Sequence, residues 1–154
     1  MKPHEIERES FRIILSELGE HNFTQQELVI VQRVIHATAD FDFTQLLKFS
    51  PYAIQAGLSA IRNGCKFISD VQMIAAGVSR PYMEKYGCHL ECRINHQEVI
   101  TQAQTLGKTR SETAILHFGE SLNNSIILIG NAPTALFEVL RLHEEQQIQP
   151  ALII

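Results

Sequence analysis

The chain lacks several features that would place it in a specialised class of protein. Its 154 residues include no tryptophan and only three cysteines. An odd number of cysteines makes a disulfide framework a poor explanation and favours a reducing compartment. No apolar run approaches the roughly 20 residues needed to span a bilayer. The N-terminus is acidic and polar, where a signal peptide would be basic and then apolar. We therefore expect a cytoplasmic protein with no membrane partner.

Positive charge is scarce as well. Thirteen Lys and Arg residues stand against 17 Asp and Glu, for a formal net charge of −4, and no basic stripe with interleaved aromatics occurs. This balance disfavours a nucleic-acid partner. Hydrophobic residues make up 45% of the chain and charged residues 19%, which is typical of a globular protein. The length predicts one domain, 1–154, large enough to bury a core.

Most motifs of metal and nucleotide chemistry are missing too. The chain has no HExxH, no GxGxxG, no complete P-loop before Gly107 and no serine nucleophile elbow. Cys88, Cys92 and His96 resemble a ligand cluster, but their spacing fits neither zinc nor iron–sulfur sites. On a strand, residues four apart lie roughly 13 Å from each other. We expect neither a metal nor another cofactor.

What is present is an alternation of helical and strand patterns. We predict strands at 65–71, 88–94, 125–129 and 151–154, and a loop at 81–87. We predict helices at 5–18, 43–49, 51–62, 71–76, 97–106, 111–122 and 133–143. A further helix begins at a capping box formed by Thr24 and Glu27 and runs to Ala39. Short apolar strands between helices favour an α/β fold, with a mainly parallel four-stranded sheet between two helical layers. Ligands then bind at the carboxyl ends of the strands.

The segment Ile126–Leu136 carries the first candidate site. Its apolar strand stops at Gly130, and Pro133 suits the first turn of the helix that follows. Free backbone N–H groups and the helix dipole would make this turn an anion site. An ordinary strand-to-helix connection explains the same pattern, and spacing alone favours that explanation.

His36 is the sharpest single candidate for chemistry. Helical spacing places Arg33 one turn before it and Asp40 one turn after it, on the face opposite the apolar stripe. A histidine can exchange a proton near neutral pH, so His36 is a candidate general acid. A solvated surface histidine is the plainer interpretation. Lys108, Thr109 and Arg110 at a helix start form a second candidate anion site, although solvated basic residues are the usual explanation for such groups.

Taken together, these segments resemble the precorrin-8X methylmutase family, also called precorrin isomerase, of cobalamin biosynthesis. The resemblance spans most of residues 5–154 in the family's order. Its most specific stretches are VIHAT, SDVQMIAAGVSR, GKTRS and IGNAPTAL. It implies an isomerase that moves a methyl group from C-11 to C-12 of a corrinoid ring to give hydrogenobyrinic acid, or its cobalt-containing equivalent, without a cofactor. It also implies a homodimer.

The resemblance assigns roles to particular residues. His36 takes the catalytic acid–base position. A substrate rich in carboxylates needs cations and N–H or hydroxyl donors, and its flat ring needs an apolar lining. The substrate-binding residues expected on this basis are Ser10, Arg33, Met73, Arg80, Thr109, Arg110, Asn131, Ala132 and Thr134.

The ending of the chain bears on this interpretation. Family members continue past the last strand with another strand and a helix, which makes five strands in the family sheet. We therefore expect a C-terminally shortened form of the domain, although a naturally short domain remains an alternative. A non-catalytic corrinoid-binding or carrier module is the alternative function, and a generic nucleotide-binding module is a more distant one.

Overall fold

The computed structural model describes residues 2–154, which form two compact units, 1–54 and 55–154. Helix α4 (Ala53–Arg62) begins in the first unit and continues in the second. The expectation of one domain over 1–154 stays a prediction. Along residues 2–154, no helix combines the length and apolarity that crossing a membrane requires.

The first unit consists of short-range helical structure. It contains α1 (Pro3–Glu17), α2 (Gln25–Thr38) and α3 (Phe43–Leu46). The predicted capping box is confirmed: Thr24 Oγ1 accepts from the Glu27 N–H at 3.3 Å, and the Glu27 carboxylate accepts from the Thr24 N–H at 2.8 Å. Buried Ile14, Val31 and Ile35 form the centre of its core, and half-buried aromatic rings pack around them.

The second unit contains a parallel sheet, as predicted. Its strands are β1 (Lys66–Ser69), β2 (His89–Glu91), β3 (Ile126–Leu128) and β4 (Leu152–Ile153), in the order β2-β1-β3-β4. All three pairings are parallel, with Ile68 opposite Ile127 in the central one. The strands are shorter than predicted, but the α/β class and the number of strands in this chain are confirmed.

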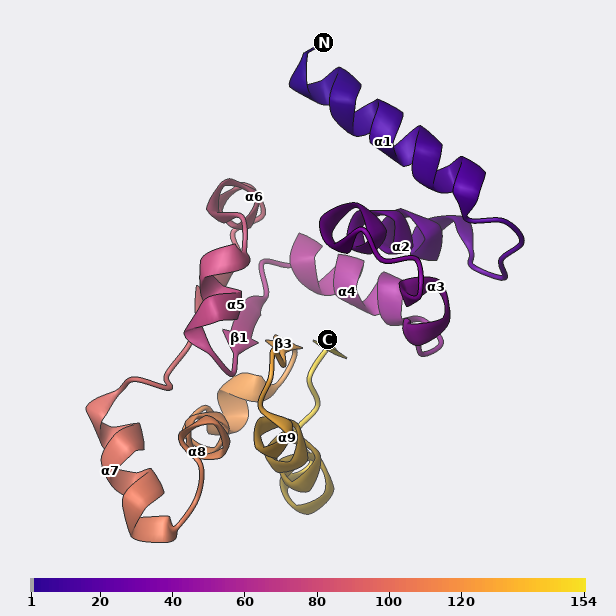
Figure 1. The fold of residues 1–154 in the computed structure, drawn as a ribbon. Helices are drawn as coiled ribbons and strands as arrows, with labels where there is room; N and C mark the ends of the chain where they lie inside the picture. Colours follow the sequence, from indigo (N-terminus) through magenta and orange to yellow (C-terminus); the bar gives the residue numbers. More distant parts are fainter. Residues whose placement is uncertain (1) are drawn as a thin grey trace. The chain divides into compact units, whose positions relative to one another are not determined.

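Helices of the second unit connect the strands and cover the sheet. They are α5 (Gln72–Gly77), α6 (Arg80–Lys85), α7 (Gln97–Leu106), α8 (Arg110–Leu116) and α9 (Pro133–Gln146). Helices α8 and α9 lie side by side in Figure 1. They enclose the main core with Ile68 and Ile127 on one face of the sheet. On the other face, Gly57 of α4 comes so close to Leu152 that an added Cβ would lie 3.0 Å from its Cδ2.

Two predicted elements were wrong. Residues predicted as a loop at 81–87 belong largely to helix α6, because Pro81 stands in its first turn, where a missing N–H costs nothing. The helix predicted at 111–122 ends at Leu116, and a short 3-10 turn, η1 (Gly119–Leu122), follows it. Gly119, with φ 50°, begins this turn, because its left-handed backbone cannot continue the α-helix.

Candidate functional site

The turn after β3 is held by a buried carboxylate from the neighbouring strand. Asp70 follows β1 directly, and its backbone N–H donates to Leu128 O at 3.2 Å. Its side chain is fully buried. One oxygen, Oδ1, accepts from the Gly130 N–H at 2.8 Å. The other, Oδ2, accepts from the N–H groups of Asn131 and Ala132 at 3.3 and 3.0 Å.

This arrangement corrects the expectation for the Gly130 turn. The three N–H groups do form an anion-binding turn, but the anion that they bind is the chain's own Asp70. A buried carboxylate is stable only when hydrogen bonds satisfy it, and these donors do so. They are therefore not free to bind a substrate carboxylate. Sequence reasoning places Asp70 at the same edge of the sheet as the Gly130 turn but assigns it no role, although a single acid directly after a buried strand is a usable signal.

Glycine is required at position 130 by close packing. A Cβ there would lie 2.6 Å from Cγ1 of Ile74 and 3.0 Å from Cγ2 of Val71. Real Cβ atoms do not approach other atoms this closely, so any side chain would displace the turn or the start of α5. The Gly130 turn is thus fixed by the hydrogen bonds that it donates to Asp70 and by packing against α5.

The starts of α8 and α9 come together beside this turn. Thr109 caps α8, where its Oγ1 accepts from the Glu112 N–H at 3.1 Å. The same oxygen lies 2.8 Å from Oγ1 of Thr134, in the first turn of α9. Thr109 and Asn131 are exposed, and Thr134 and Ala132 are half-buried. The structure therefore brings four of the predicted substrate-binding residues to one place.

Two neighbouring cations at the start of α8 behave differently. Lys108 Nζ donates to the carboxylates of Glu112, at 2.5 Å, and of buried Glu138, at 3.3 Å. These bonds, chiefly the one to Glu112, raise the pKa of Lys108. They also occupy N–H donors of its ammonium group with partners in the protein itself. Exposed Arg110 forms no salt bridge within residues 2–154. Of the two, Arg110 is the cation open to an external anion.

Arg80 and Met73 lie on the helices that follow β1. Arg80 borders a cavity of about 370 Å³ formed by α5, α6 and β2, and it has no carboxylate partner in the described part of the chain. Its neighbours in that cavity include Val78 and Met83. Met73 is 67% exposed. Both residues are accessible, as substrate binding would require.

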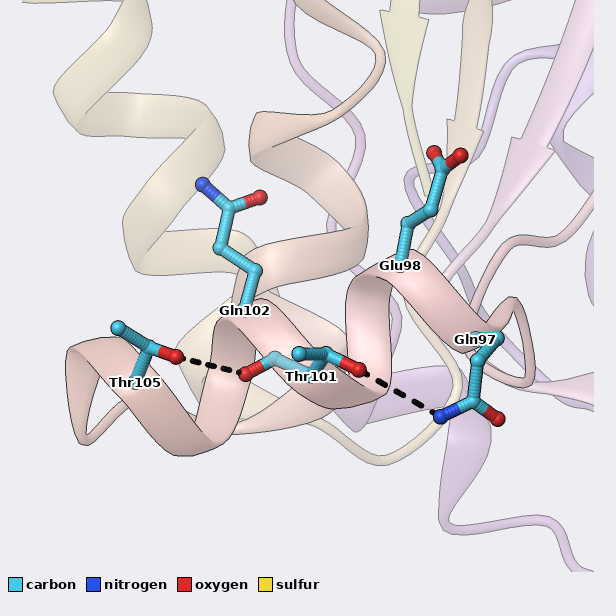
Figure 2. Close-up of a pocket in the computed structure, with 5 residues that line it drawn as sticks. All are labelled: Gln97, Glu98, Thr101, Gln102 and Thr105. Carbon is cyan, nitrogen blue, oxygen red and sulfur yellow. Dashed lines mark hydrogen bonds between the residues drawn. The ribbon is translucent and has the colours of Figure 1, made fainter.

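A second depression, of about 410 Å³, lies along α7 (Figure 2). Its polar side chains mostly bond within the helix. Thr101 Oγ1 accepts from the Gln97 amide at 3.4 Å, and the Thr105 hydroxyl donates to the Thr101 carbonyl at 3.1 Å (Figure 2). Gln102 is hydrogen-bonded to His117. None of the predicted site residues borders this depression.

Cys88, Cys92 and His96, considered as a ligand cluster from their spacing, do not gather into one group in the described structure. Within residues 2–154, no three His, Cys, Asp or Glu side chains are placed to hold a metal ion. The Cys88 thiol donates to the Ile61 carbonyl at 3.4 Å. Burial, followed by the neighbouring Cys88, raises the pKa of Cys65 to about 11, which keeps that thiol protonated and unreactive at neutral pH.

His36 lies exposed in the last turn of α2, in the first unit. The imidazole ring of His36 and the phenyl ring of Phe11, which lies on α1, make an edge-type contact with ring centroids 5.2 Å apart. The Arg33 guanidinium lies 5.3 Å from the same Phe11 ring and pairs with Glu7 at 3.2 Å. Half-buried Ser10 precedes Phe11 on α1. Two of the three predicted residues of this unit, His36 and Arg33, therefore lie against one aromatic side chain.

The predicted pairing of His36 with Asp40 is wrong. Helix α2 ends at Thr38, and Ala39 adopts a left-handed conformation with φ 56°, so Asp40 does not continue the helical face. The Asp40 carboxylate instead accepts from the Asp42 N–H at 2.9 Å. The predicted site residues are therefore not one cluster: those of the first unit lie on α1 and α2, and those of the second lie partly at the starts of α8 and α9 and partly on α5 and α6.

Comparison with known proteins identifies the family. The model of the precorrin-8X methylmutase family matches residues 5–154. The chain belongs to the precorrin-8X methylmutase family. A cobalt-precorrin-8 methylmutase from Leptospira interrogans is 44% identical over 97% of this chain and 69% of its own length. One from Priestia megaterium is 41% identical over 100% of this chain and 68% of its own length.

Solved structures agree with this membership. A crystal structure of precorrin-8X methyl mutase from Thermus thermophilus superposes with a TM-score of 0.89 at 38% identity. It covers 97% of this chain, which corresponds to 72% of that protein. The resemblance to the precorrin-8X methylmutase family drawn from the sequence motifs is therefore confirmed.

Proposed function

We propose that this chain is a precorrin-8X methylmutase, an isomerase that moves a methyl group from C-11 to C-12 of the corrinoid ring. The product is hydrogenobyrinic acid or its cobalt-containing equivalent. The observation that carries the proposal is the family match over residues 5–154. The identity of 44% with a cobalt-precorrin-8 methylmutase over nearly the whole chain supports it.

The reaction rearranges one molecule and leaves its composition unchanged. The methyl group loses its bond to C-11 and forms one to C-12, so no electron acceptor and no second substrate are needed. His36 lends a proton to the ring, which makes the methyl group readier to migrate, and the proton returns after migration. Its exposure in the last turn of α2 supports this role, because a proton donor must be able to reach the substrate.

Substrate carboxylates are bound by cations that the protein does not use for its own structure. Arg80 and Arg110 have no salt bridge within residues 2–154. Arg33 has one, to Glu7, but its side chain is 65% exposed, so this bond contributes little and a substrate carboxylate can replace Glu7. Around these cations we assign hydroxyl and amide donors and an apolar lining. They are Ser10, Thr109, Asn131 and Thr134 as donors, and Met73 and Ala132 as lining.

Replacement of the proposed proton donor tests the function. We expect His36→Ala to lower kcat by about 10²–10⁴-fold, the usual contribution of general acid catalysis. The assay follows conversion of precorrin-8X to hydrogenobyrinic acid by its visible spectrum. His4→Ala is the control, because His4 is also an exposed histidine on a helix of the first unit. Normal turnover by His36→Ala would refute the proposed role.

The same assay separates the enzyme from a carrier. If the unmodified chain takes up a stoichiometric amount of corrinoid without converting it, the carrier function replaces the isomerase. Assays with metal-free and cobalt-containing substrate define the accepted form. We expect the cobalt form to be preferred, because the relatives with 44% and 41% identity are named for it.

We further propose that the protein acts as a homodimer in the cytoplasm. The dimer is an expectation from the family resemblance, and a cytoplasmic location suits a small-molecule isomerase of this family. Light scattering of the purified chain measures its mass directly. A monomer that turns over substrate at the full rate would contradict a requirement for the dimer.

A further inference from the structure

Asp70 is a buried charged group that the proposed chemistry does not use. Its side chain has 0% exposure, and no basic side chain contacts it within the described residues. Its carboxylate is balanced only by backbone N–H groups, those of Gly130, Asn131 and Ala132. Burial of a charge lowers stability unless hydrogen bonds compensate for it, so a buried carboxylate beside the candidate site indicates a specific role.

We propose that Asp70 is a positioning residue for substrate binding, an inference that rests on the proposed function. By holding three successive N–H groups, it sets the path of the backbone from Gly130 to Ala132. That path determines where the exposed Asn131 side chain lies and where α9 begins. Asp70 itself is buried beneath the turn and does not touch the substrate.

The same geometry extends to α8 through side-chain contact. Thr134 stands in the first turn of α9, and its hydroxyl lies 2.8 Å from that of Thr109, the N-cap of α8. A displaced Gly130 turn would move Thr134 away from Thr109. Asp70 therefore positions donors on two helices, although it contacts only the turn before one of them.

The charge of Asp70 also decides how the site recognises its substrate. The N–H groups that could have bound a substrate carboxylate already bind Asp70, and Pro133 has no N–H to offer. Recognition at this wall of the site must come from side chains: the amide of Asn131, the one hydroxyl proton that the bond between Thr109 and Thr134 leaves free, and the guanidinium of neighbouring Arg110. These donors fit oxygen atoms at the edge of a corrinoid.

Asp70→Asn tests the proposal, because an amide nitrogen cannot accept the N–H bonds that one carboxylate oxygen accepts. We expect KM to rise about tenfold while kcat stays within twofold, since binding groups are displaced and the proton donor is not. We also expect amide exchange at Gly130, Asn131 and Ala132 to quicken at least tenfold, measured by NMR. An unchanged KM together with a lowered Tm would overturn the proposal and leave Asp70 a purely structural role.

Ser69→Ala is the matched control. Ser69 is equally buried at the end of the same strand, but its hydroxyl bonds to the Val71 carbonyl at 3.1 Å and not to the Gly130 turn. It should lower stability without raising KM. If Ser69→Ala raises KM as much as Asp70→Asn does, the effect is general loosening and the proposal fails.

A double-variant cycle shows whether Asp70 acts through Asn131. Asn131→Ala alone should raise KM, and adding Asp70→Asn to it should raise KM by clearly less than tenfold. Fully additive effects would contradict action through Asn131.

If Asp70→Asn does not fold, Gly130→Ala replaces it, because the added Cβ would meet Ile74 and displace the turn while the carboxylate stays. A normal KM in that variant would overturn the proposal. Absence of both turnover and corrinoid binding in the unmodified chain would instead refute the proposed function, and this inference with it.

Discussion

Two salt-bridged regions of the molecule each join a pair of helices, but they differ in burial. Between α8 and α9, the Glu138 side chain is 2% exposed and binds Lys108 and Arg141. Between α1 and α2, Arg33 and Glu7 are 65% and 46% exposed. Water competes strongly for the second pair and hardly at all for Glu138. The charges around Glu138 therefore stabilise the fold. The Arg33 charge, in contrast, remains accessible to a ligand.

The largest stability effect should come from Glu138. We expect Glu138→Gln to lower the free energy of unfolding by about 2 kcal/mol, because its two cationic partners would then face a neutral amide in a buried position. The matched change Glu7→Gln should cost less than about 0.5 kcal/mol. Urea unfolding of both variants measures the difference. Equal costs would break the distinction between the two regions.

Acid should weaken the buried region, because the folded protein lowers the pKa of its carboxylate. Hydrogen bonds from Arg141 lower the pKa of Glu138, against the opposing effect of burial and with further help from Lys108. A carboxylate whose pKa is lower in the folded state stabilises the protein above its unfolded pKa of about 4.3. This stabilisation is lost as the pH falls through the lowered value.

We therefore expect the free energy of unfolding to fall between about pH 5 and pH 3, and to fall less steeply in Glu138→Gln. Denaturant titrations at stepped pH provide the measurement. Glu91 contributes in the same direction, because the charges and hydrogen bonds of Arg93 and Lys66 outweigh burial and lower its pKa. Parallel pH curves for the variant and the unmodified chain would show that Glu138 has no part in the acid response.

The smallest effect concerns backbone strain in the first unit. Tyr52 has φ 65°, a left-handed conformation unfavourable for a residue with a Cβ, and its side chain is 80% exposed. We expect Tyr52→Gly to stabilise the chain by about 0.5–1 kcal/mol, since relief of strain exceeds the added freedom of the unfolded chain. Tyr82→Gly, at an exposed tyrosine inside α6, should destabilise instead. Thermal unfolding distinguishes the two outcomes.

Local patterns predicted most of the fold because each element is encoded nearby. The capping box at Thr24 and the apolar strands around Ile68 and Ile127 depend on residues within a few positions. Gly130 and Pro133 correctly marked the start of α9. The error at α6 was local too, since Pro81 was interpreted as part of a loop although it suits a first helical turn.

The candidate site was harder to predict because its contacts are distant in sequence. Asp70 and Gly130 are 60 positions apart, and Lys108 and Glu138 are 30 apart. Part of the difference between Lys108 and Arg110 is local, because Glu112 stands four positions after Lys108 and binds it. The second carboxylate, that of Glu138, reaches Lys108 only through the packing of α8 against α9.

The long separation between Asp70 and its three donors also bears on how the chain reaches this structure. Loop closure over such a distance has an entropic cost that no local hydrogen bond can offset. Pairing of the central strands β1 and β3 brings Asp70 and Gly130 together, so the Gly130 turn forms with the sheet. Folding of the sheet and assembly of the turn become a single slow event, characteristic of parallel topology. An intermediate with intact helices but unpaired central strands would have no binding wall at Asn131.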